Sequence, residues 1–342
     1  MKPSATKTLV MATLTPGRCT PDMLRGMRKG GMAGVRINSA HADASTLRGM
    51  VADIRSIDPA ISILVDTKGP ELRTTAFAPP RQELNLTPGR EISICEGMGP
   101  SDSTTLYLPV AGIEASLRRA DEILIDDGAI KLRRIGTAAG GITAHTVTGG
   151  LLGSHKTVAL PGVTLPPMPA VTDADRRSIE AAREAGIDII AHSFVRSAAD
   201  VLAVRELLQG TSIQLYAKIE TAEALADIAE IARVADGLLV ARGDLGTQIP
   251  LETIPEAQYR IASEAWRRGK PLMISTQILH SMESAPAPSR AELSDIALAV
   301  MERATWVLLC GETARGDHPR ECVLTASRTI EQVTGKLPYV VG

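Results

Sequence analysis

The stretch 214–244 is QLYAKIETAEALADIAEIARVADGLLVARGD, and it contains two short apolar runs separated by a longer helical pattern. The runs 214–218 and 238–242 are largely apolar at successive positions, as strands are when both faces of a parallel sheet are buried. A strand, a helical pattern and a second strand in this order predict one βα unit of a parallel sheet.

The same alternation recurs along the chain. Helical patterns lie between the apolar runs; one of them begins after Thr172, carries an apolar stripe through Ile179, Ala182 and Ala185, and stops at Gly186. Eight such repeats predict an α/β fold, a closed (β/α)₈ TIM barrel. The expected strands are 9–13, 34–38, 62–66, 188–193, 214–218, 238–242, 272–276 and 306–310.

The regular alternation breaks once, between the third and fourth expected strands. Residues 74–156 are punctuated by Gly and Pro and contain short β-type runs at 91–95, 122–125 and 142–148. We therefore expect a small inserted β-barrel lid domain at 74–156, with the Pro-rich passage 161–169 as the return linker. Residues 1–73 and 157–342 would form the TIM-barrel catalytic domain.

Composition narrows the class of protein. Of the 342 residues, 44% are hydrophobic and 22% charged, which is typical of a globular protein. The net charge of −2 does not indicate a basic surface for binding nucleic acid. The cysteines, at 19, 95, 310 and 322, are too scattered for a disulfide framework or a zinc site. The N-terminus lacks the pattern of a signal peptide, and no apolar run approaches 18 residues. We expect a cytoplasmic protein that neither binds nucleic acid nor enters a membrane.

Charged residues follow the expected strands, where a barrel of this kind carries its functional groups. Glu220 and Asp244 are hard oxygen donors after neighbouring strands, a pair suited to magnesium. Lys218 lies two positions before Glu220, so on an extended segment both point to one face, and its charge could stabilise an enolate or a transferring phosphoryl group. The peptide groups around Gly243 could hold a carboxylate. The sequence predicts a small substrate with several negative charges.

Five segments, in this order along the chain, resemble the motifs of the pyruvate kinase family. They are 66–71 (DTKGPE), 240–246 (VARGDLG), 275–277 (STQ), 289–292 (SRAE) and 311–314 (GETA), and the resemblance runs from about residue 8 to residue 331. It implies transfer of phosphate between phosphoenolpyruvate and ADP to give pyruvate and ATP, with magnesium, as in glycolysis.

The resemblance also implies roles for individual residues. Lys218 would stabilise the phosphoryl group and the enolate, Thr276 would assist protonation of enolpyruvate, and Glu220 and Asp244 would hold magnesium. Arg36 joins Lys218 and Thr276 as a catalytic residue. The implied substrate-binding residues are Lys218, Gly243, Asp244, Thr276 and Arg73, and the implied nucleotide-binding residues are Arg36, Asn38, His41, Arg73 and Lys156.

A potassium site is implied by the resemblance, but one ligand has changed. Asn38, Asp66 and Thr67 match the family, whereas Ala40 stands where the family has a serine. We expect a weakened potassium site. Ser39 would replace the lost oxygen only if the backbone bends there, because successive strand side chains face opposite ways.

After a predicted helix at 319–333 the sequence given ends at residue 342, where usual members of the family continue into a C-terminal regulatory domain. We expect a short form of the family with a barrel and a lid, without allosteric effector control, and at most a homodimer through barrel helices.

Other functions fit parts of the same pattern. A magnesium-dependent lyase or decarboxylase could use the same groups on a pyruvate enolate, and the enzyme could serve a specialised pathway that uses phosphoenolpyruvate. A third alternative is a silent sensor of phosphoenolpyruvate. The lid lysine, Lys156, favours phosphoryl transfer. His192 is expected to be a hydrogen-bonded structural residue, and Cys310, at a usual family serine, a small buried filler.

Overall fold

A computed structural model describes residues 7–341, except the side chain of His41, which lies outside the described residues. The chain forms two compact units. The barrel unit comprises the described residues up to Gly69, Ala170–Arg242 and those from Ile254 onward, and the inserted unit comprises Pro70–Pro169 and Gly243–Thr253.

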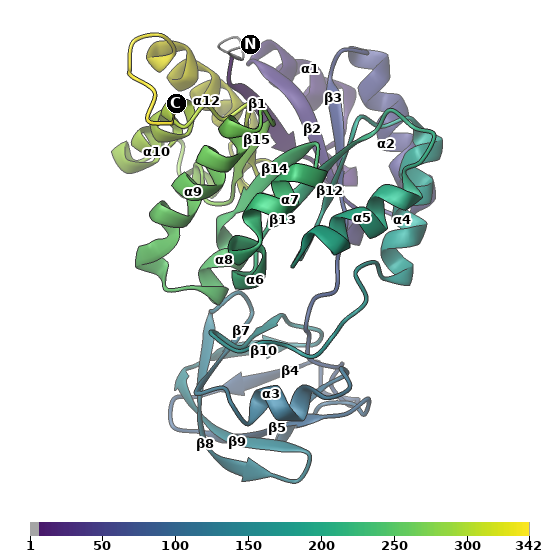
Figure 1. Cartoon of the computed structure of the whole chain (residues 1–342), viewed down its shortest axis with the longest axis vertical. Coiled ribbons are helices and arrows are strands. Elements are labelled where there is room, and N and C mark those ends of the chain that lie inside the picture. Colours follow the sequence, from purple (N-terminus) through teal and green to yellow (C-terminus); the bar gives the residue numbers. More distant parts are fainter. Residues whose placement is uncertain (1–6, 342) are drawn as a thin grey trace. The chain divides into compact units, whose positions relative to one another are not determined.

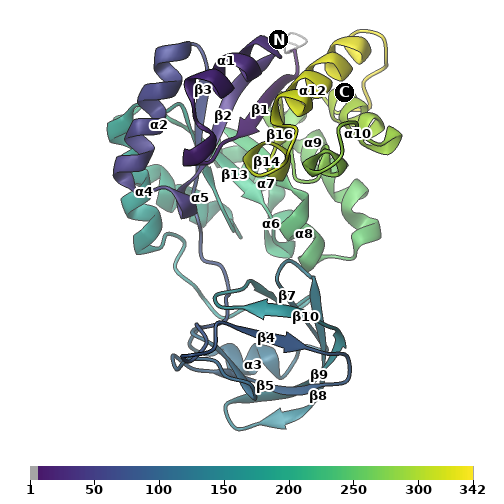
Figure 2. The same cartoon turned by 180° about the vertical axis from the view of Figure 1, so that it is seen from behind.

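Eight parallel strands close the barrel, as predicted. Their order around it is β1-β16-β15-β14-β13-β12-β3-β2, so that each strand lies beside its neighbours in the sequence of barrel strands. Figures 1 and 2 show the helices around the outside of these strands. Apolar side chains from the strands, among them Met11, Leu64, Tyr216 and Met273, form a buried cluster. The strands are β1 Leu9–Thr13, β2 Met32–Asn38, β3 Ser62–Asp66, β12 Ile189–His192, β13 Gln214–Ile219, β14 Gly237–Ala241, β15 Leu272–Ser275 and β16 Trp306–Leu309.

Four residues predicted to end strands lie just beyond them, and the first of these is Ser193, which follows β12. Arg242 begins a helix, because its side chain turns to the 275 and 276 carbonyls and to Asp295. Thr276 has φ 73°, a left-handed conformation that no strand residue adopts. Cys310 donates its backbone N–H to Glu312 Oε2 at 2.7 Å instead of continuing the ladder. These strands therefore end one residue earlier than the sequence predicted.

The helices follow the predicted punctuation. Thr172 and Asp175 form a capping box at the start of α4, whose apolar side buries Ile179 and Ala182, and Gly186 ends that helix at φ 71°. The helices that begin in the barrel unit are α1 Pro21–Lys29, α2 Ala44–Ile57, α4 Asp173–Ala185, α5 Ala198–Leu207, α6 Ala222–Ala226, α7 Ile228–Val234, α8 Arg242–Gln248, α9 Ile254–Arg267, α10 Arg290–Met301, α11 Gly311–Ala314 and α12 Pro319–Val333, with short 3₁₀ turns η1 Pro16–Arg18, η2 Ser39–His41 and η4 His280–Glu283.

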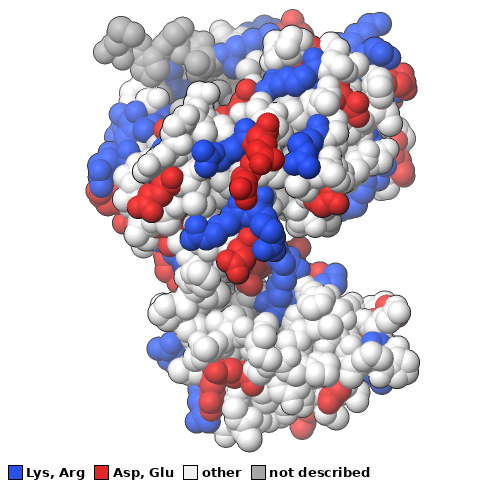
Figure 3. Space-filling model, turned by 90° about the vertical axis from the view of Figure 1, so that its right-hand side faces the viewer, with Lys and Arg blue, Asp and Glu red and all other residues white. Residues whose placement is uncertain are grey.

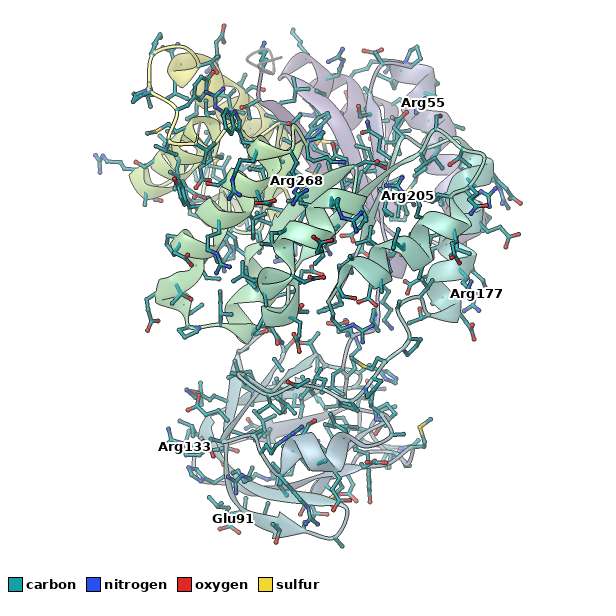
Figure 4. The ribbon with its side chains drawn as sticks, viewed as in Figure 1. Arg55, Glu91, Arg133, Arg177, Arg205 and Arg268 are labelled. Carbon is teal, nitrogen blue, oxygen red and sulfur yellow. The ribbon has the colours of Figure 1, made fainter. Side chains whose placement is uncertain are left out.

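Two similar Asp–Arg clamps join elements at the amino ends of the strands, and Figure 4 labels their arginines, Arg55 and Arg205. Asp236, just before β14, accepts the backbone N–H of Leu215 at 2.8 Å and pairs with Arg205 of α5 at 2.6 Å. Asp188, just before β12, accepts the N–H of Ile63 at 2.7 Å and pairs with Arg55 at 2.8 Å. In each clamp one carboxylate fixes a strand, its neighbour and a helix.

The inserted unit is built on two sheets and one short helix. Its larger sheet has the order β11-β7-β8-β9-β5-β6, and β10 pairs with β4 alone. The expected β unit is present, but these ladders form open sheets rather than a closed small barrel. The chain leaves β9 at Gly149, where a side chain would meet the Leu86 carbonyl at 2.2 Å, and then pairs with β4. The elements are β4 Glu83–Leu86, β5 Glu91–Glu96, β6 Thr105–Leu108, α3 Ile113–Leu117, β7 Glu122–Ile125, β8 Ile130–Ala138, β9 Gly141–Thr148, β10 Gly150–Gly153 and β11 Val158–Ala159, with η3 Leu251–Thr253 in the segment 243–253.

The inserted unit is wider than the predicted range 74–156. Leu72 accepts the backbone N–H of Val158 at 2.8 Å, Arg73 forms a bridge with Thr157, and Leu160 belongs to the core of this unit. Residues 70–73 and 157–169 therefore group with the inserted strands, as does 243–253. The predicted linker, 161–169, contains neither helix nor strand.

The surface carries charges of both signs. On the face seen in Figure 3, basic and acidic side chains lie beside one another, in keeping with a net charge of −2 over the sequence. Among the described residues, no helix combines the length and the apolar character needed to cross a bilayer.

Candidate active site

Lys218 lies at the centre of a buried group of charged side chains at the carboxyl ends of the barrel strands. Its Nζ atom is 3.1 Å from Asp66 Oδ1 and 2.9 Å from Glu220 Oε1. Nζ also donates a hydrogen bond of 2.7 Å to the Ser193 hydroxyl. Lys218 and Glu220 point the same way, as expected for residues two apart on an extended segment. The structure thus brings an ammonium group together with two carboxylates.

Asp66, the last residue of β3, joins Lys218 to Arg36. The Nε atom of Arg36 donates to Asp66 Oδ2 at 2.8 Å, Nη2 contacts the same oxygen, and Nη1 donates to Thr13 Oγ1 at 3.1 Å. Burial by itself would raise the pKa of Asp66, but Lys218 and Arg36 outweigh it and hold this pKa below its usual value. Asp66 is therefore ionised at neutral pH and fixes both cations.

A chain of hydrogen bonds continues from Asp66 to His192. The Ser193 hydroxyl lies 3.0 Å from Asp66 Oδ1, and the Ser193 backbone N–H donates to Thr67 Oγ1 at 3.1 Å. Thr67 Oγ1 in turn lies 2.9 Å from His192 Nδ1. His192 Nε2 is 2.9 Å from the Ala170 carbonyl, which can only accept, so Nε2 carries the proton. Burial lowers the pKa of His192, so the ring is neutral and Nδ1 accepts from Thr67. Both ring nitrogens are used, and His192 orients Thr67.

One oxygen of Glu220 is prepared for a further partner. Glu220 is fully buried, and its Oε2 accepts the backbone N–H of Phe194 at 2.8 Å. Its Oε1 is close to the Lys218 ammonium but outside hydrogen-bond geometry, and this buried atom has no hydrogen-bond partner among the described residues. A buried carboxylate oxygen of this kind fits a magnesium ligand. No group of three or more His, Cys, Asp or Glu side chains is arranged for a metal in the described part of the chain, and the predicted site uses two carboxylates.

Thr276 follows β15 in a strained turn. Its φ is 73° and that of Gln277 is 57°, a conformation that is rare for residues other than glycine and a clear outlier for a β-branched side chain. Thr276 is partly buried, whereas Gln277 is exposed. Strain of this kind persists only where the surroundings hold it, and it is concentrated at functional sites.

The predicted potassium ligands already have hydrogen-bond partners. Asn38 Oδ1 accepts the backbone N–H of Ala40 at 3.0 Å and caps η2. Asp66 and Thr67 are engaged as described above. β2 ends at Asn38 and η2 begins at Ser39, so the backbone bends at Ser39. Such a bend is the condition under which Ser39 could replace the ligand oxygen that Ala40 lacks.

Apart from His41, whose side chain lies outside the described residues, the other predicted residues belong to the inserted unit. Arg73 donates to Glu71 Oε2 at 2.6 Å and to the His155 carbonyl at 2.6 Å. Lys156 Nζ donates to Asp126 Oδ1 at 2.9 Å. Gly243 and Asp244 lie in the first turn of α8, where the Asp244 carbonyl accepts the Thr247 hydroxyl at 2.8 Å. An approach of these residues to Lys218 and Glu220 stays a prediction.

Two features of the site escaped the sequence reasoning. Ser193 links Lys218 to Asp66 from a position directly after β12, whereas the sequence predicted it as the last residue of that strand. The pairing of Arg36 with Asp66 joins residues 30 positions apart, and no local pattern indicated it.

Comparison with known proteins points to one family. The family model described as pyruvate kinase, barrel domain, matches residues 5–323. A pyruvate kinase of Methylorubrum extorquens is 39% identical over 331 residues, which cover 96% of this chain and 68% of the relative.

Two further relatives give the same result. The pyruvate kinase of Geobacillus stearothermophilus is 39% identical over 93% of this chain and 55% of its own length. The pyruvate kinase of Sporosarcina psychrophila is 35% identical over 97% of this chain and 58% of its own length. The chain thus spans between about half and two thirds of the length of these three relatives.

Proposed function

Because the chain belongs to the pyruvate kinase family, we propose that it transfers a phosphoryl group between phosphoenolpyruvate and ADP, giving pyruvate and ATP. The observation that carries this proposal is the buried Lys218 ammonium, held by Asp66, Glu220 and Ser193 at the carboxyl ends of the strands. A fixed cation in a dry site stabilises charge that develops on a phosphoryl oxygen or an enolate.

The charges around Lys218 balance before substrate arrives. Arg36 and Lys218 carry two positive charges, and Asp66 and Glu220 carry two negative ones. The side chains are held by one another, so little reorganisation is needed when a substrate anion approaches Lys218. This preorganisation supports catalysis by positioning and electrostatics.

Glu220 and Asp244 are the residues that would hold magnesium. The buried Glu220 Oε1, which has no hydrogen-bond partner among the described residues, supports this assignment. When bound, the ion neutralises charge on substrate oxygens. Two protein carboxylates leave its other positions to water and substrate, which is the usual arrangement for magnesium in phosphoryl transfer.

Thr276 is our proposal for the proton transfer that completes the reaction. Its hydroxyl would relay a proton from water to the methylene carbon of enolpyruvate, taking up one proton as it gives up another, while Lys218 holds the enolate oxygen. The backbone N–H groups at Gly243 and Asp244, in the first turn of α8, would receive the substrate carboxylate. Arg36, Asn38, His41, Arg73 and Lys156 stay our predictions for the nucleotide side.

A paired assay tests the function. Phosphoenolpyruvate, ADP and magnesium should give ATP and pyruvate, and oxaloacetate under the same conditions should not be decarboxylated at a comparable rate. Decarboxylation without ATP formation would favour the lyase alternative and overturn the proposal. If the protein is inactive with both substrates, calorimetry would show whether it binds phosphoenolpyruvate, as a sensor would.

A magnesium titration tests the ligands. Glu220→Ala and Asp244→Ala should each raise the magnesium concentration needed for half-maximal activity, because each variant removes one of two protein carboxylates. Glu230→Ala, at a half-exposed position on α7 whose carboxylate pairs with Arg233, is the matched control. Unchanged titrations in both site variants would remove these residues from the metal site.

Three finer expectations also stay predictions. Activation by potassium should be weak, because Ala40 contributes no side-chain oxygen. At most a homodimer through barrel helices is expected, so light scattering should find a dimer or a monomer. A location in the cytoplasm is expected from the composition and would be measured by fractionation.

A further inference from the structure

The Arg242 guanidinium lies between a carboxylate and the strained turn at Thr276. Nη1 and Nη2 donate to the two oxygens of Asp295 at 2.7 and 2.8 Å. On its other side, Nη2 donates to the Thr276 carbonyl at 2.8 Å, and Nε lies 3.2 Å from that oxygen and 3.3 Å from the Ser275 carbonyl. The Arg242 and Asp295 side chains are 13% and 25% exposed. This is a bidentate, largely buried pair rather than a surface contact.

The turn that Arg242 holds would not keep its shape alone. Thr276 and Gln277 both have positive φ, a conformation that is unfavourable for residues other than glycine unless the surroundings fix it. β15 ends at Ser275, whose hydroxyl donates to the Val240 carbonyl at 2.9 Å, so the sheet fixes the residue before the turn. Beyond Ser275, the carbonyl of Thr276 is fixed by Arg242.

Asp295 sets the direction of the Arg242 side chain. It projects from α10, a helix that begins with a capping box formed by Ser289 and Glu292. A guanidinium is planar, so once both of its terminal nitrogens are bound to Asp295 the opposite edge can point in only one direction. That edge meets the carbonyls of the turn.

We propose that Asp295 and Arg242 are positioning residues for proton transfer, acting through Thr276. By holding the Ser275 and Thr276 carbonyls, and so the peptide planes on both sides of Thr276, they keep its φ positive, and this conformation sets where the Thr276 hydroxyl points. The inference rests on the proposed function, in which that hydroxyl protonates enolpyruvate. A small displacement of a reacting group is sufficient to reduce a rate by about 100-fold.

The first test separates proton transfer from substrate binding. Asp295→Asn keeps the shape of the side chain but removes its charge, and Arg242→Lys keeps the charge but removes the planar fork. In each variant, exchange of the pyruvate methyl protons with deuterium oxide, followed by NMR in the presence of ATP and magnesium, should fall by about 10-fold or more. The KM for phosphoenolpyruvate should change by less than about 3-fold, because the pair does not stabilise bound substrate.

A matched control pair lies elsewhere in the barrel. Arg205 also joins an aspartate, Asp236, to a backbone carbonyl, that of Val234. Arg205→Lys and Asp236→Asn should lower thermal stability without lowering the exchange rate per folded molecule. An equal loss of exchange in both pairs would mean that the effect is one of general stability, and would overturn the proposal.

A double-mutant cycle and a structure complete the test. In a Thr276→Val background, Asp295→Asn should cause no further loss of exchange, because the hydroxyl on which it acts is gone. Additive losses would overturn the inference. Normal exchange in Thr276→Val alone would overturn both the inference and the proposed role of Thr276.

The conformation of the turn is a readout that does not depend on activity. A crystal structure of Asp295→Asn should show Thr276 relaxed out of the positive φ region. Retention of φ near 73°, the value in the unaltered chain, would overturn the inference even in a protein without kinase activity. Two results could also separate the inference from the proposed function. If the unaltered protein forms no ATP but the turn relaxes in Asp295→Asn, the proposed function is contradicted and the structural role of the pair is established.

Discussion

Lys218 has a structural role as well as a proposed chemical role. Its ammonium group is the ion-pair partner of Glu220 and one of the two cations beside Asp66. Because both carboxylates are buried, removing the lysine leaves Glu220 without a cation, whereas Asp66 keeps Arg36. A fall in activity on substitution therefore has to be separated from a fall in stability.

Lys218→Met should lower kcat by roughly two to four orders of magnitude, with little change in the affinity for phosphoenolpyruvate, because the charge acts mainly in the transition state. The free energy of unfolding should also fall, by about 3 to 5 kcal/mol, since one partner of a buried ion pair is lost. Steady-state kinetics below the unfolding transition and urea denaturation measure the two effects. Lys270→Met, which removes a lysine bound to the Ala235 carbonyl, is the control. Near-normal turnover in Lys218→Met would exclude the lysine from the mechanism.

Glu302 is a buried acid outside the proposed chemistry. It is 2% exposed, and its Oε2 accepts a hydrogen bond of 2.7 Å from Gln258. Burial raises the pKa of Glu302 to about 7, and the nearby Asp295 adds to this shift. Between the ordinary value of 4.5 and about 7, the folded protein holds a proton that the unfolded chain has lost. The free energy of unfolding therefore falls as the pH rises through this window.

Glu302→Gln should remove the fall in the free energy of unfolding with rising pH, because the amide is neutral at every pH. Its oxygen can still accept a hydrogen bond from Gln258. The variant should gain on the order of 1 to 3 kcal/mol over the unaltered protein at pH 8, and little at pH 4.5. Urea denaturation at several pH values measures the difference. Glu230→Gln on the exposed side of α7 is the control, and a Glu302→Gln effect that does not vary with pH would contradict the assignment.

At the scale of elements, the Asp–Arg clamps place stability and proposed chemistry at opposite ends of the strands. Asp236 and Asp188 act at the amino ends, whereas Lys218, Asp66 and Thr276 lie at the carboxyl ends. In barrels of this kind the amino-terminal face serves stability and the carboxyl-terminal face serves function. Substitutions in a clamp should therefore affect folding alone.

Asp236→Ala should lower the free energy of unfolding by about 1 to 3 kcal/mol, because it leaves the backbone N–H of the buried Leu215 without its acceptor. Asp188→Ala, at the equivalent place before β12, should have a similar effect through Ile63. Thermal denaturation measures the loss, and kcat of the folded fraction should stay unchanged in both variants. A large change in kcat without a change in stability would mean that the clamps influence the carboxyl ends.

The sequence predicted the barrel strands because each is a short apolar run buried on both sides. The sequence prediction placed Arg242, Thr276 and Cys310 inside strands. The contacts that end these strands join Arg242 to residues distant in the sequence, or join the Cys310 backbone to the side chain of Glu312, and no strand pattern indicates either. The pairing of the inserted strands could not be predicted, because alternation within a short strand does not specify its partner. The parallel pairing of β5 with β6 and the separate pairing of β4 with β10 are examples.

The sequence predicted part of the proposed site but not its long-range contacts. The spacing of Lys218 and Glu220 placed both on one face of a strand, and the structure brings them to 2.9 Å. The contacts of Asp66 with Arg36 and of Arg242 with Asp295 depend on neighbouring strands and helices in the folded barrel. Such contacts have no signal in a local pattern, and they require the tertiary structure.

At the scale of the whole molecule, each unit has a hydrophobic core of its own. The core of the inserted unit contains Ile94 and Leu106, and that of the barrel contains Leu64 and Met273. Every residue of each core lies within one unit. Chains with separate cores commonly depart from two-state unfolding, because each unit can open on its own.

Ile94→Ala and Met273→Ala test whether the two cores are independent. Both side chains are almost fully buried, at 1% and 0% exposure, so each substitution should cost about 2 to 5 kcal/mol in its own unit. Amide hydrogen exchange followed by mass spectrometry should then show faster exchange for Ile94→Ala in the strands between β4 and β11, and for Met273→Ala in the barrel strands. Each variant serves as the control for the other. Faster exchange throughout the chain in both variants would mean that the units unfold as one cooperative body, and the stability of the barrel could then not be altered without altering that of the insertion.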